Sequence, residues 1–499
     1  MTSGDDANAP AVVIGGGIGG LAAARLLSRH YRRVVVLERD VRPDVAGAED
    51  AFASWSRPGV PQFRHSHAFL ARIRLVLLAH LPDALQRLRA AGVREITLAE
   101  TVPPGMPFTA RPDDEDVVLL ACRRATFEWA LRESARTVPG IALREGVHVH
   151  GLVAAGGNGG RPEVTGVRLA DGEVVPAALV VDASGRRSRA PEWLAAIGAP
   201  EPSERSVDTG IFYYTRFYRL RRAQAPVGGT GLVAGDLGWV KLAIFPGDGD
   251  TFSITVGRNV EDASLKDLAD PRVFERFLGA FPSVRPWRTN GASVPIDGPD
   301  TPVLVMGQLR NRRRRFVDAE GALAPGFVAI GDAAYHSNPI YGRGCVGALV
   351  QAALLGEAVG RHPGDPRAVA RHLHRESEAE LRPFWEAAAS SDRRALGVEP
   401  TLALANPRAT IVHMAEQAVG WFLERGMLPA SRVDAKVFRA LLRVFHMLEP
   451  PDKLLRDPEL ILRSLPVLAR VLRGDAPGQQ FAPVPRAAVL ARMAAADAG

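Results

Sequence analysis

The chain has 499 residues, of which 46% are apolar and 23% charged, a composition typical of globular proteins and not of disordered ones. The net charge is +7, but acidic and basic residues are interspersed, which favours an anionic small ligand and argues against nucleic acid as a partner. Two cysteines are too few for a disulfide framework, and the polar, acidic first ten residues are not typical of a signal peptide. No uncharged stretch reaches the roughly 18 residues of a membrane span, so we expect a cytoplasmic protein that does not associate with membranes.

The N-terminal segment has the pattern of a dinucleotide-binding unit. A short apolar run at residues 11–14 predicts a buried parallel strand, and a second run at 34–37 predicts another that ends at Glu38. Between them lie the glycine-rich turn 15–20, which reads Gly-x-Gly-x-x-Gly, and the helix-forming residues 21–28. This order is typical of a site for FAD or NAD, and the pattern alone leaves open which of the two is bound.

Residues of this pattern have distinct physical roles in binding a dinucleotide. Gly15 permits the tight turn, Gly17 lets the backbone approach a pyrophosphate, and Gly20 lets the helix pack closely on the strand. The helix N-terminus offers free N–H groups and the positive end of its dipole to the phosphates. Glu38 suits the hydroxyls of a ribose and would repel a 2′-phosphate.

The rest of the chain changes from sheet-like to helical segments. A β-meander is predicted at residues 147–181 and ends in Asp-Ala-Ser-Gly at 182–185, and antiparallel strands are predicted at 210–256. A buried strand at 326–330 leads into the glycine-rich segment 331–347. From about residue 366 onward the pattern is helical.

Three separated segments carry a resemblance to a known family. They read Gly-Val-Pro-Gln-x-Arg-His-x-His at 59–67, Val-Asp-Ala-Ser-Gly-Arg at 181–186, and Gly-Asp followed by Asn-Pro-Ile-Tyr-Gly-x-Gly at 331–344. Together with the glycine-rich turn, they resemble the FAD-dependent monooxygenases of the para-hydroxybenzoate hydroxylase fold (group A flavoproteins). Within that family the chain is most similar to the branch of the polyether epoxidases. The resemblance covers about residues 10–360.

The resemblance implies an α/β fold: a Rossmann-like FAD-binding domain of the GR2 type with a β-meander, an inserted antiparallel-sheet substrate domain and a helical C-terminal region. The expected boundaries are 10–90, 117–204 and 298–365 for the FAD-binding domain, 91–116 and 205–297 for the substrate domain, and 366–499 for the helical region. For the helical region three roles remain open, namely capping the active site, forming a dimer face or extending the core. Both a monomer and a homodimer are compatible with the sequence.

The resemblance also implies FAD as the cofactor and assigns residues to two groups. The expected cofactor-binding residues are Gly15, Gly17, Ile18, Gly19, Gly20, Glu38, Arg39, Arg124, Asp182, Gly185, Gly331, Asp332, Pro339, Gly342, Gly344 and Cys345. The expected catalytic residues, beside the isoalloxazine, are Gln62, Arg64, His65 and Pro339. By residue type alone, Asp332 also fits a helix cap, Pro339 a loop proline and Arg124 a surface arginine. His65 and His67 could ligate a metal, but without a nearby Cys or carboxylate cluster we expect none.

The function implied is that of a monooxygenase, in which reduced FAD reacts with oxygen and a flavin hydroperoxide hydroxylates or epoxidises an apolar small molecule, as in secondary metabolism. The expected partners are therefore this substrate and molecular oxygen. The segment at 182–185 lacks the Asp-Gly of hydroxylases that bind NAD(P)H, so NAD(P)H donates electrons either directly or through a separate flavin reductase.

Several alternatives stay open. A flavin-dependent reductase of isoprenoid double bonds and a redox-neutral flavin cyclase fit the same motifs, and a scaffold or membrane-surface protein would use the helical tail. A flavin halogenase is disfavoured, because no lysine precedes Lys241 and no Trp-x-Trp motif occurs. The aromatic residues at 212–218 fit either a substrate pocket or the core of a sheet. For the basic run 310–315, a solvated face or pairing with acids is favoured over NADPH or nucleic acid.

Overall fold

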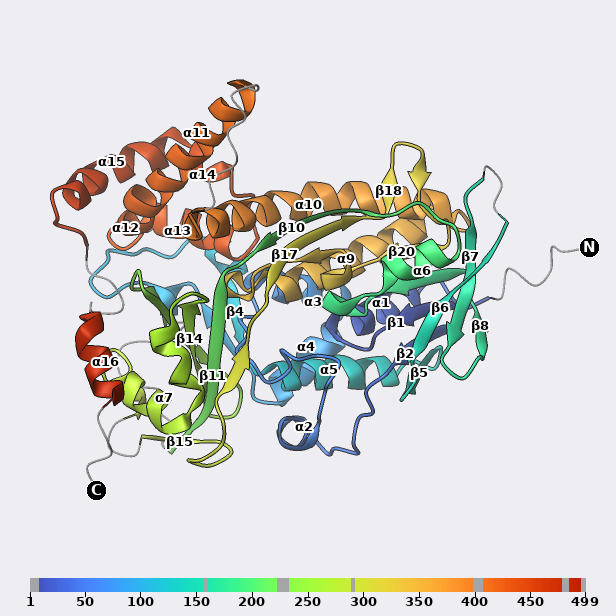
Figure 1. Ribbon diagram of the computed structural model, residues 1–499, viewed down its shortest axis with the longest axis horizontal. Helices are drawn as coiled ribbons and strands as arrows, with labels where there is room; N and C mark the ends of the chain where they lie inside the picture. The colour runs from blue at the N-terminus through green and yellow to red at the C-terminus, as the bar shows by residue number, and fades with distance from the viewer. Residues whose placement is uncertain are drawn as a thin grey trace, which may run out of the picture.

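The computed structural model describes residues 9–156, 160–221, 233–288, 292–397, 407–477 and 484–494. The first eight residues, which carry most of the polar N-terminus discussed above, lie outside this range, as do the last five of the helical region. Figure 1 shows a Rossmann-type α/β unit at one end, an antiparallel sheet at the other and helices of the C-terminal region along one side. The α/β fold class expected from the sequence is therefore confirmed.

A five-stranded parallel sheet forms the centre of the first unit, in the order β20-β9-β1-β2-β5. Its strands are β1 (Ala11–Ile14), β2 (Val34–Glu38), β5 (Ile141–Glu145), β9 (Leu179–Asp182) and β20 (Phe327–Ala329). The inner strands are buried along their whole length because both faces of the sheet are covered, which explains their continuous apolar sequence.

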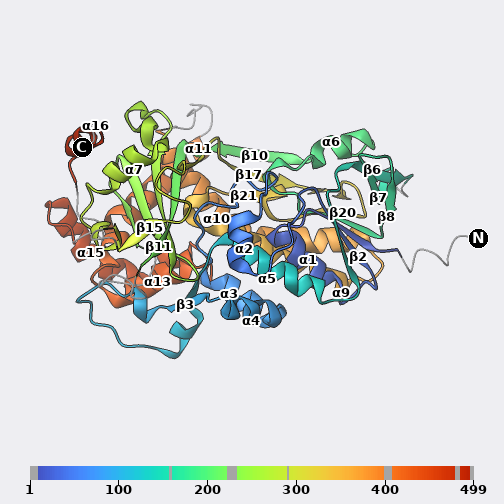
Figure 2. The ribbon, with the colours of Figure 1, turned by 90° about the horizontal axis from the view of Figure 1, so that it is seen from below.

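Side chains alternate between the two faces of this sheet. Val13, Val36 and Val181 pack against the helices α1 (Ile18–Leu27), α5 (Arg124–Arg136) and α9 (Arg343–Arg361). Val12 and Val180 pack against the meander of β6 (Val149–Ala155), β7 (Glu163–Leu169) and β8 (Val174–Pro176). Figure 2 shows α1, α5 and α9 on their common side of the sheet. Period-two alternation therefore builds two separate cores from one strand pattern.

A six-stranded antiparallel sheet forms the second unit, in the order β12-β13-β14-β11-β15, with β16 also paired to β11. Its strands are β11 (Ile211–Leu220), β12 (Val233–Asp236), β13 (Val240–Pro246), β14 (Thr251–Asn259), β15 (Ser293–Pro295) and β16 (Leu304–Met306). One face packs on the 3₁₀ segment Ala263–Ala269 and on the helices α7 (Pro271–Leu278) and α8 (Arg285–Arg288). The other face is turned toward a cavity described below.

The aromatic residues of β11 divide between these faces. Tyr214 and Tyr218 belong to the core beneath α7, whereas Tyr213 lines the cavity. Phe217 packs with Phe52 and Trp55 in a separate small core. The aromatic run therefore divides between sheet core and cavity wall, because neighbouring strand residues point to opposite faces.

A long antiparallel pair connects the two units. β10 (Ser203–Asp208) pairs with β17 (Arg310–Arg315), and β17 also pairs with the short strand β21 (Tyr335–His336). Figure 1 shows β10 and β17 running along α10 (Pro366–Ala395). The basic run lies in β17, where Arg314 pairs with Glu204 at 2.7 Å and Arg310 with Asp208 at 2.8 Å. Pairing with acids is thus observed for this run.

Further helices and strand pairs precede α9 in the chain. They are α2 (Ala48–Ser54), α3 (Ala71–His80), α4 (Pro82–Ala90), α6 (Ala190–Ala196), the pair β3 (Arg94–Thr97) and β4 (Val118–Ala121), and the pair β18 (Val317–Asp318) and β19 (Gly321–Ala322). Single 3₁₀ turns lie at Ala99–Thr101, Pro112–Asp116, Gly185–Arg187, Gly331–Ala333 and Pro339–Tyr341. The last three of these turns border the cavity.

The C-terminal region is helical, as the sequence predicts. Beyond α10 it contains α11 (Pro407–Phe422), a π-helical turn (Leu423–Met427), α12 (Leu428–Ala430), α13 (Ala435–Phe445), α14 (Lys453–Arg456), α15 (Pro458–Leu472) and α16 (Arg486–Ala494). Met427, Val437 and Val467 join the same core as α1 and α9, so this region extends the core. α16 instead packs on α7 of the second unit. In the described part of the chain no helix is both long and apolar enough to cross a membrane.

Candidate active site

A large cavity lies where the two units and the C-terminal helices meet. Its volume is about 1510 Å³, above the roughly 300–1,000 Å³ of an ordinary small-molecule pocket. The glycine-rich turn lines one end, the antiparallel sheet lines one wall, and residues of α10, α12, α13 and α15 line another. The space therefore exceeds what one small ligand needs.

The glycine-rich turn is built as its sequence predicts. Gly15 has a φ of +100°, and a Cβ there would lie 2.6 Å from the backbone oxygen of Ala183. A Cβ on Gly20 would lie 1.8 Å from the backbone oxygen of Gly15, so only glycine lets α1 pack here. At Gly17 no atom lies within 4 Å of a Cβ position, and the residue lines the cavity at the N-terminus of α1. The open side of the turn is therefore free to receive a phosphate group.

Glu38 at the end of β2 lines the cavity but is already hydrogen-bonded within the protein. Its carboxylate accepts from the backbone N–H of Gly16 at 2.7 Å and of Asp40 at 2.9 Å. Arg57 donates to it at 2.6 Å. A carboxylate has four lone-pair positions, so capacity remains for a ribose hydroxyl.

Arg57 is a residue of the cavity wall that sequence reasoning missed. It is 5% exposed and forms ion pairs with Glu38, Asp40 and Glu128. Burial lowers the pKa of Arg57, but the three carboxylates outweigh this and raise it. Arg124 binds the same Glu128 at 2.7 Å. The partners come from β2, the segment after it and α5, so no short sequence pattern could have revealed this cluster.

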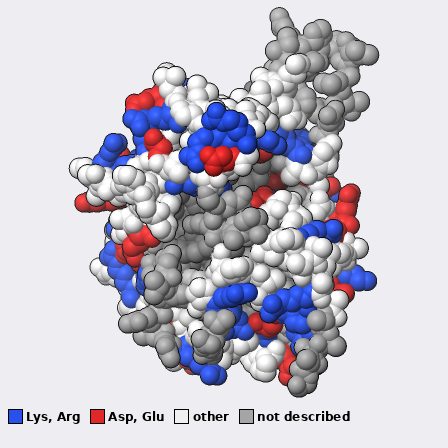
Figure 3. All heavy atoms as spheres, turned by 90° about the vertical axis from the view of Figure 1, so that its left-hand side faces the viewer, with Lys and Arg blue, Asp and Glu red and all other residues white. Residues whose placement is uncertain are grey.

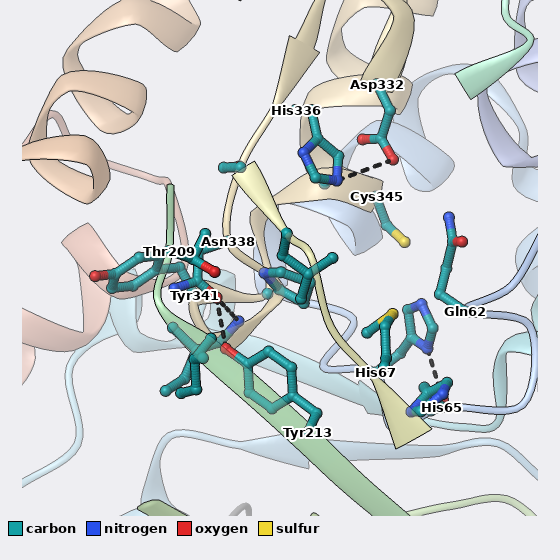
Figure 4. Close-up of a pocket in the computed structure, with 18 of the residues that line it drawn as sticks. Gln62, His65, His67, Thr209, Tyr213, Asp332, His336, Asn338, Tyr341 and Cys345 are labelled. Carbon is teal, nitrogen blue, oxygen red and sulfur yellow. Dashed lines mark hydrogen bonds and ion pairs between the residues drawn. The ribbon is translucent and has the colours of Figure 1, made fainter. Parts of the chain in front are cut away.

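The segment 62–67 brings Gln62, His65 and His67 to the cavity (Figure 4). The side-chain oxygen of Gln62 is buried and has no hydrogen-bond partner in the protein. His65 bonds to the hydroxyl of Thr215 at 3.1 Å, and burial together with Arg186 lowers its pKa to about 4. Burial and Arg124 lower the pKa of His67 to about 3. Both imidazoles are therefore neutral at pH 7.

The structure does not bring Arg64 to the cavity. Its guanidinium donates to the backbone oxygen of Ala53 at 2.9 Å and lies over the ring of Phe52 at 5.7 Å. Its neighbours Gln62 and His65 line the cavity while Arg64 does not. The predicted catalytic role of Arg64 has no support in this geometry.

Asp182 and Gly185 occupy different positions within the Asp-Ala-Ser-Gly turn. Asp182 is fully buried and accepts hydrogen bonds from Ser188 Oγ at 2.5 Å and from Ser184 Oγ at 2.6 Å. It therefore holds the turn and does not itself line the cavity, whereas Gly185 and the neighbouring Arg186 do. The role of Asp182 toward a cofactor is indirect in this geometry.

The segment 331–345 forms the inner wall. Gly331 has a φ of +60°, and its N–H donates to the side chain of Gln351 in α9 at 2.8 Å, a contact that sequence reasoning missed. Asp332 lines the cavity and lies 4.0 Å from His336 Nε2 (Figure 4). Gly342, with a φ of +66°, caps α9, whose free N–H groups start at this wall.

The predicted residues thus divide clearly by position. Those that line the cavity are Gly15, Gly17, Ile18, Gly19, Glu38, Arg39, Gln62, His65, Arg124, Gly185, Gly331, Asp332, Pro339, Gly342, Gly344 and Cys345. Gly20, Arg64 and Asp182 do not line it. Burial raises the pKa of Cys345 to about 11, so its thiol is protonated at pH 7.

Residues outside the predicted set complete the cavity. The antiparallel sheet contributes Tyr213 and Lys241, and the C-terminal helices contribute Asp392, Leu428 and Phe445. From the sequence, capping the active site was one of three open roles for the helical region, which contains no recognisable motif. The disfavoured halogenase must also be reconsidered, since the first lysine of the chain lies on the cavity wall.

The residues present fit FAD. An open glycine turn at a helix N-terminus, an unpartnered buried amide at Gln62 and a second helix N-terminus at Gly342 surround one continuous space. These groups match a pyrophosphate and the polar edge of a flavin. No group of three or more His, Cys, Asp or Glu that could hold a metal occurs among the described residues.

Comparisons with known proteins agree with this fit. Residues 11–113 match the family model described as FAD dependent oxidoreductase. Protein Rv3254 of Mycobacterium tuberculosis is 29% identical over 404 residues, which cover 75% of this chain and 78% of that protein.

Solved structures share the fold at low sequence identity. PqsL, a probable FAD-dependent monooxygenase from Pseudomonas aeruginosa, is 19% identical with a TM-score of 0.51, covering 78% of this chain and 96% of that one. The myxobacterial chondrochloren halogenase CndH is 20% identical with a TM-score of 0.54, covering 82% and 90%. The Diels-Alderase PyrE3 of pyrroindomycin biosynthesis is 19% identical with a TM-score of 0.53, covering 88% and 80%. Residues 11–113 are therefore similar to an FAD-dependent oxidoreductase domain, and the chain shares its fold with a probable FAD-dependent monooxygenase, a halogenase and a Diels-Alderase.

Proposed function

We propose that the protein is an FAD-dependent monooxygenase that hydroxylates or epoxidises an apolar organic substrate. The observation that carries this proposal is the single cavity in which the FAD-binding turns meet a wall from the antiparallel sheet and the C-terminal helices. These walls come together around one space that is large enough for a cofactor and a second ligand.

The protein's own residues provide binding and orientation. The N-terminus of α1 with Gly17 binds the pyrophosphate, and the N-terminus of α9 beyond Gly342 stabilises negative charge at the flavin edge. The amide of Gln62, whose oxygen has no partner in the protein, orients toward the flavin or the substrate. Bound and reduced FAD would supply the activation of oxygen, so no nucleophilic triad is required.

Apolar side chains in the cavity lining support an apolar substrate. They include Met306 of β16 and the nearby Leu309, and Leu428, Phe445 and Val471 from the C-terminal helices. These side chains form an apolar wall that limits water at the reacting centre, and charged groups such as Lys241 and Asp392 line the cavity beside it. A product of secondary metabolism, such as a polyene, polyketide or aromatic compound, fits this description.

A flavin halogenase is the second candidate, and Lys241 is the observation that favours it. This residue of β13 lines the cavity and pairs with Asp236. Flavin halogenases share the fold, as the similarity to CndH shows. A reductase of isoprenoid double bonds and a redox-neutral cyclase need the same cavity, and the Diels-Alderase PyrE3 has the same fold.

Labelled oxygen separates these functions. The FAD-loaded protein is reduced, mixed with candidate polyene, polyketide and aromatic compounds, and exposed to ¹⁸O₂ in the presence of bromide or chloride. A product with one ¹⁸O atom supports the monooxygenase. A product that carries neither label nor halogen contradicts it and favours the reductase or cyclase. A halogenated product that disappears in Lys241→Met identifies the halogenase.

The electron source is tested separately. We propose that NAD(P)H supplies the electrons, either directly or through a flavin reductase. Anaerobic mixing of the FAD-loaded protein with NADPH or NADH bleaches the flavin within seconds to minutes if the chain binds the nucleotide itself. Bleaching that requires an added flavin reductase assigns the reductase as a partner.

A further inference from the structure

Near the end of α10, Asp392 is a buried carboxylate surrounded by neutral donors. It is 5% exposed. Asn311 Nδ2 donates to its Oδ2 at 2.6 Å and the hydroxyl of Tyr341 donates to its Oδ1 at 3.0 Å. Asn338 Nδ2 lies 3.1 Å from both of its oxygens. Asp392, which belongs to the C-terminal region, therefore accepts hydrogen bonds from three side chains.

Two of these donors belong to the two ends of one loop. Asn338 begins the loop 338–342, Tyr341 lies just before its last residue, and all five of its residues line the cavity. The rest of the Asn338 side chain is also engaged, since its oxygen accepts from the hydroxyl of Tyr213 at 2.5 Å and from the N–H of Ile340 at 3.2 Å (Figure 4). The loop is thus fixed to α10 on one side and to β11 on the other.

The same loop sets where α9 begins. Gly342 is its last residue and caps α9, and Pro339 is exposed toward the cavity between the two anchored ends. Burying a carboxylate is energetically costly, and an apolar side chain would pack in the same place without that cost. An ionisable anchor that reaches both ends of the loop therefore points to a requirement for a fixed loop geometry.

We propose that Asp392 is a positioning residue that clamps the loop 338–342 at both ends and thereby sets the positions of Pro339 and of the α9 N-terminus against the flavin. This inference rests on the proposed function only in placing FAD in this cavity. It gives the C-terminal helical region a second role besides extending the core.

The clamp is tested first in the protein without FAD. Asp392→Asn keeps the size of the side chain but turns one acceptor into a donor that faces the amide donors of Asn338 and Asn311. Amide hydrogen exchange of peptides covering 338–345 should become about tenfold faster or more, because a hydrogen bond to a charged group is lost. The matched control is Glu386→Gln on the same helix, whose carboxylate is 43% exposed. Unchanged exchange in Asp392→Asn would overturn the proposal.

The consequence for the cofactor is tested next. With the far-UV circular dichroism unchanged, Asp392→Asn should weaken FAD binding about tenfold and alter the visible absorption bands of the bound flavin, which a merely structural role would leave alone. Loop loosening with wild-type affinity and spectrum would show a clamp without a role toward the flavin and would overturn the assignment. Should Asp392→Asn fail to fold, Tyr341→Phe removes one donor and is expected to show the same changes to a smaller degree. A wild-type protein that binds no FAD would instead contradict the proposed function, while the exchange result would still decide the clamp.

Discussion

Two single residues of the glycine-rich turn 15–20, Gly17 and Gly20, are glycine for different reasons. Gly20 is required because a Cβ at this position would clash with the backbone oxygen of Gly15, only 1.8 Å away. Gly17 faces open space, so the protein alone does not explain why a glycine stands there. A ligand that approaches the backbone explains it, which makes this position a direct probe of the cofactor.

Replacing Gly17 with leucine should abolish retention of FAD without unfolding the protein. The side chain would enter the space left for the pyrophosphate, while nothing in the protein clashes with it. The flavin content of the purified protein, read from its visible absorption, should fall by about tenfold or more. Gly47→Leu is the matched control, since Gly47 also precedes a helix in open space but does not line the cavity. A yellow Gly17→Leu protein would refute this placement of the cofactor.

Gln62 and Arg64 are expected to differ in their effect on turnover. Gln62→Leu should retain FAD and lower the rate of flavin reoxidation with substrate by about tenfold, because the unpartnered amide oxygen is lost from the cavity. Arg64→Met should leave the rate within about twofold, because the guanidinium binds the backbone of Ala53 outside the cavity. A large loss for Arg64→Met would require the guanidinium to turn into the cavity in the working enzyme.

At the level of elements, α16 joins the end of the chain to the antiparallel sheet unit. Val489 and Met493 are buried in the core formed by β11, β14 and α7. Arg276 of α7 donates to the backbone oxygen of Met493 at 3.1 Å. The last described helix therefore stabilises the antiparallel sheet, which forms one wall of the cavity. The residues that it contacts in α7 lie about two hundred positions earlier in the chain.

Met493→Ala should destabilise the protein by about 2–5 kcal/mol, the usual cost of removing a buried methionine side chain. Urea unfolding monitored by tryptophan fluorescence measures this change. Met414→Ala serves as the control, because Met414 lies on a helix with 66% of its surface exposed and should change the free energy of unfolding by less than about 0.5 kcal/mol. Equal effects of the two substitutions would show that α16 is not docked in solution.

The sequence predicted well those features that depend on residues close together in the chain. The strand, turn and helix at residues 11–38 follow from apolar runs and glycine spacing within one short segment. The pairing of β10 with β17 could not be predicted, because Ser203 and Arg315 are far apart in the chain and charged strands give no apolar alternation. The docking of α16 and the contacts of Asp392 were missed for the same reason, since they depend on tertiary structure.

In the whole molecule, buried histidines with lowered pKa make stability depend on pH, and the shifts are largest for three of them. Burial, aided by Arg186 for His65 and by Arg124 for His67, lowers the pKa of His65 to about 4 and of His67 to about 3, and burial lowers that of His446 to about 4. In the unfolded chain these groups take up protons near their usual pKa of 6.5, whereas the folded protein keeps them neutral. Between pH 6.5 and 4 the unfolded state therefore binds more protons, and stability falls as the pH is lowered.

The free energy of unfolding should accordingly decrease between these pH values, by about 3 kcal/mol for each histidine at most. Urea unfolding at several pH values measures the slope. His446→Asn removes one titrating group and retains an acceptor for the N–H of Ala71, so its loss of stability between these pH values should be smaller than that of the wild-type protein by up to about 3 kcal/mol. An unchanged slope would mean that His446 is protonated in the folded state. Carboxylates with lowered pKa, such as Glu449, take up protons in the unfolded chain near their usual pKa of 4.5, so they add to the slope at the acid end of this window equally in the wild-type protein and the variant.

The order of strands in the parallel sheet determines when the protein can become functional during its synthesis. β1 carries the glycine-rich turn near the start of the chain, but the sheet is closed at one edge only by β20, after about three hundred further residues. α9, whose N-terminus completes the inner wall of the cavity, comes later still. A nascent chain on the ribosome therefore carries β1 and β2 without β20 and α9 for roughly the first two thirds of its elongation, and the cavity is incomplete during that time. We expect expression to depend on chaperones that cover these strands, and we expect fragments that stop before residue 361 to accumulate as colourless aggregates.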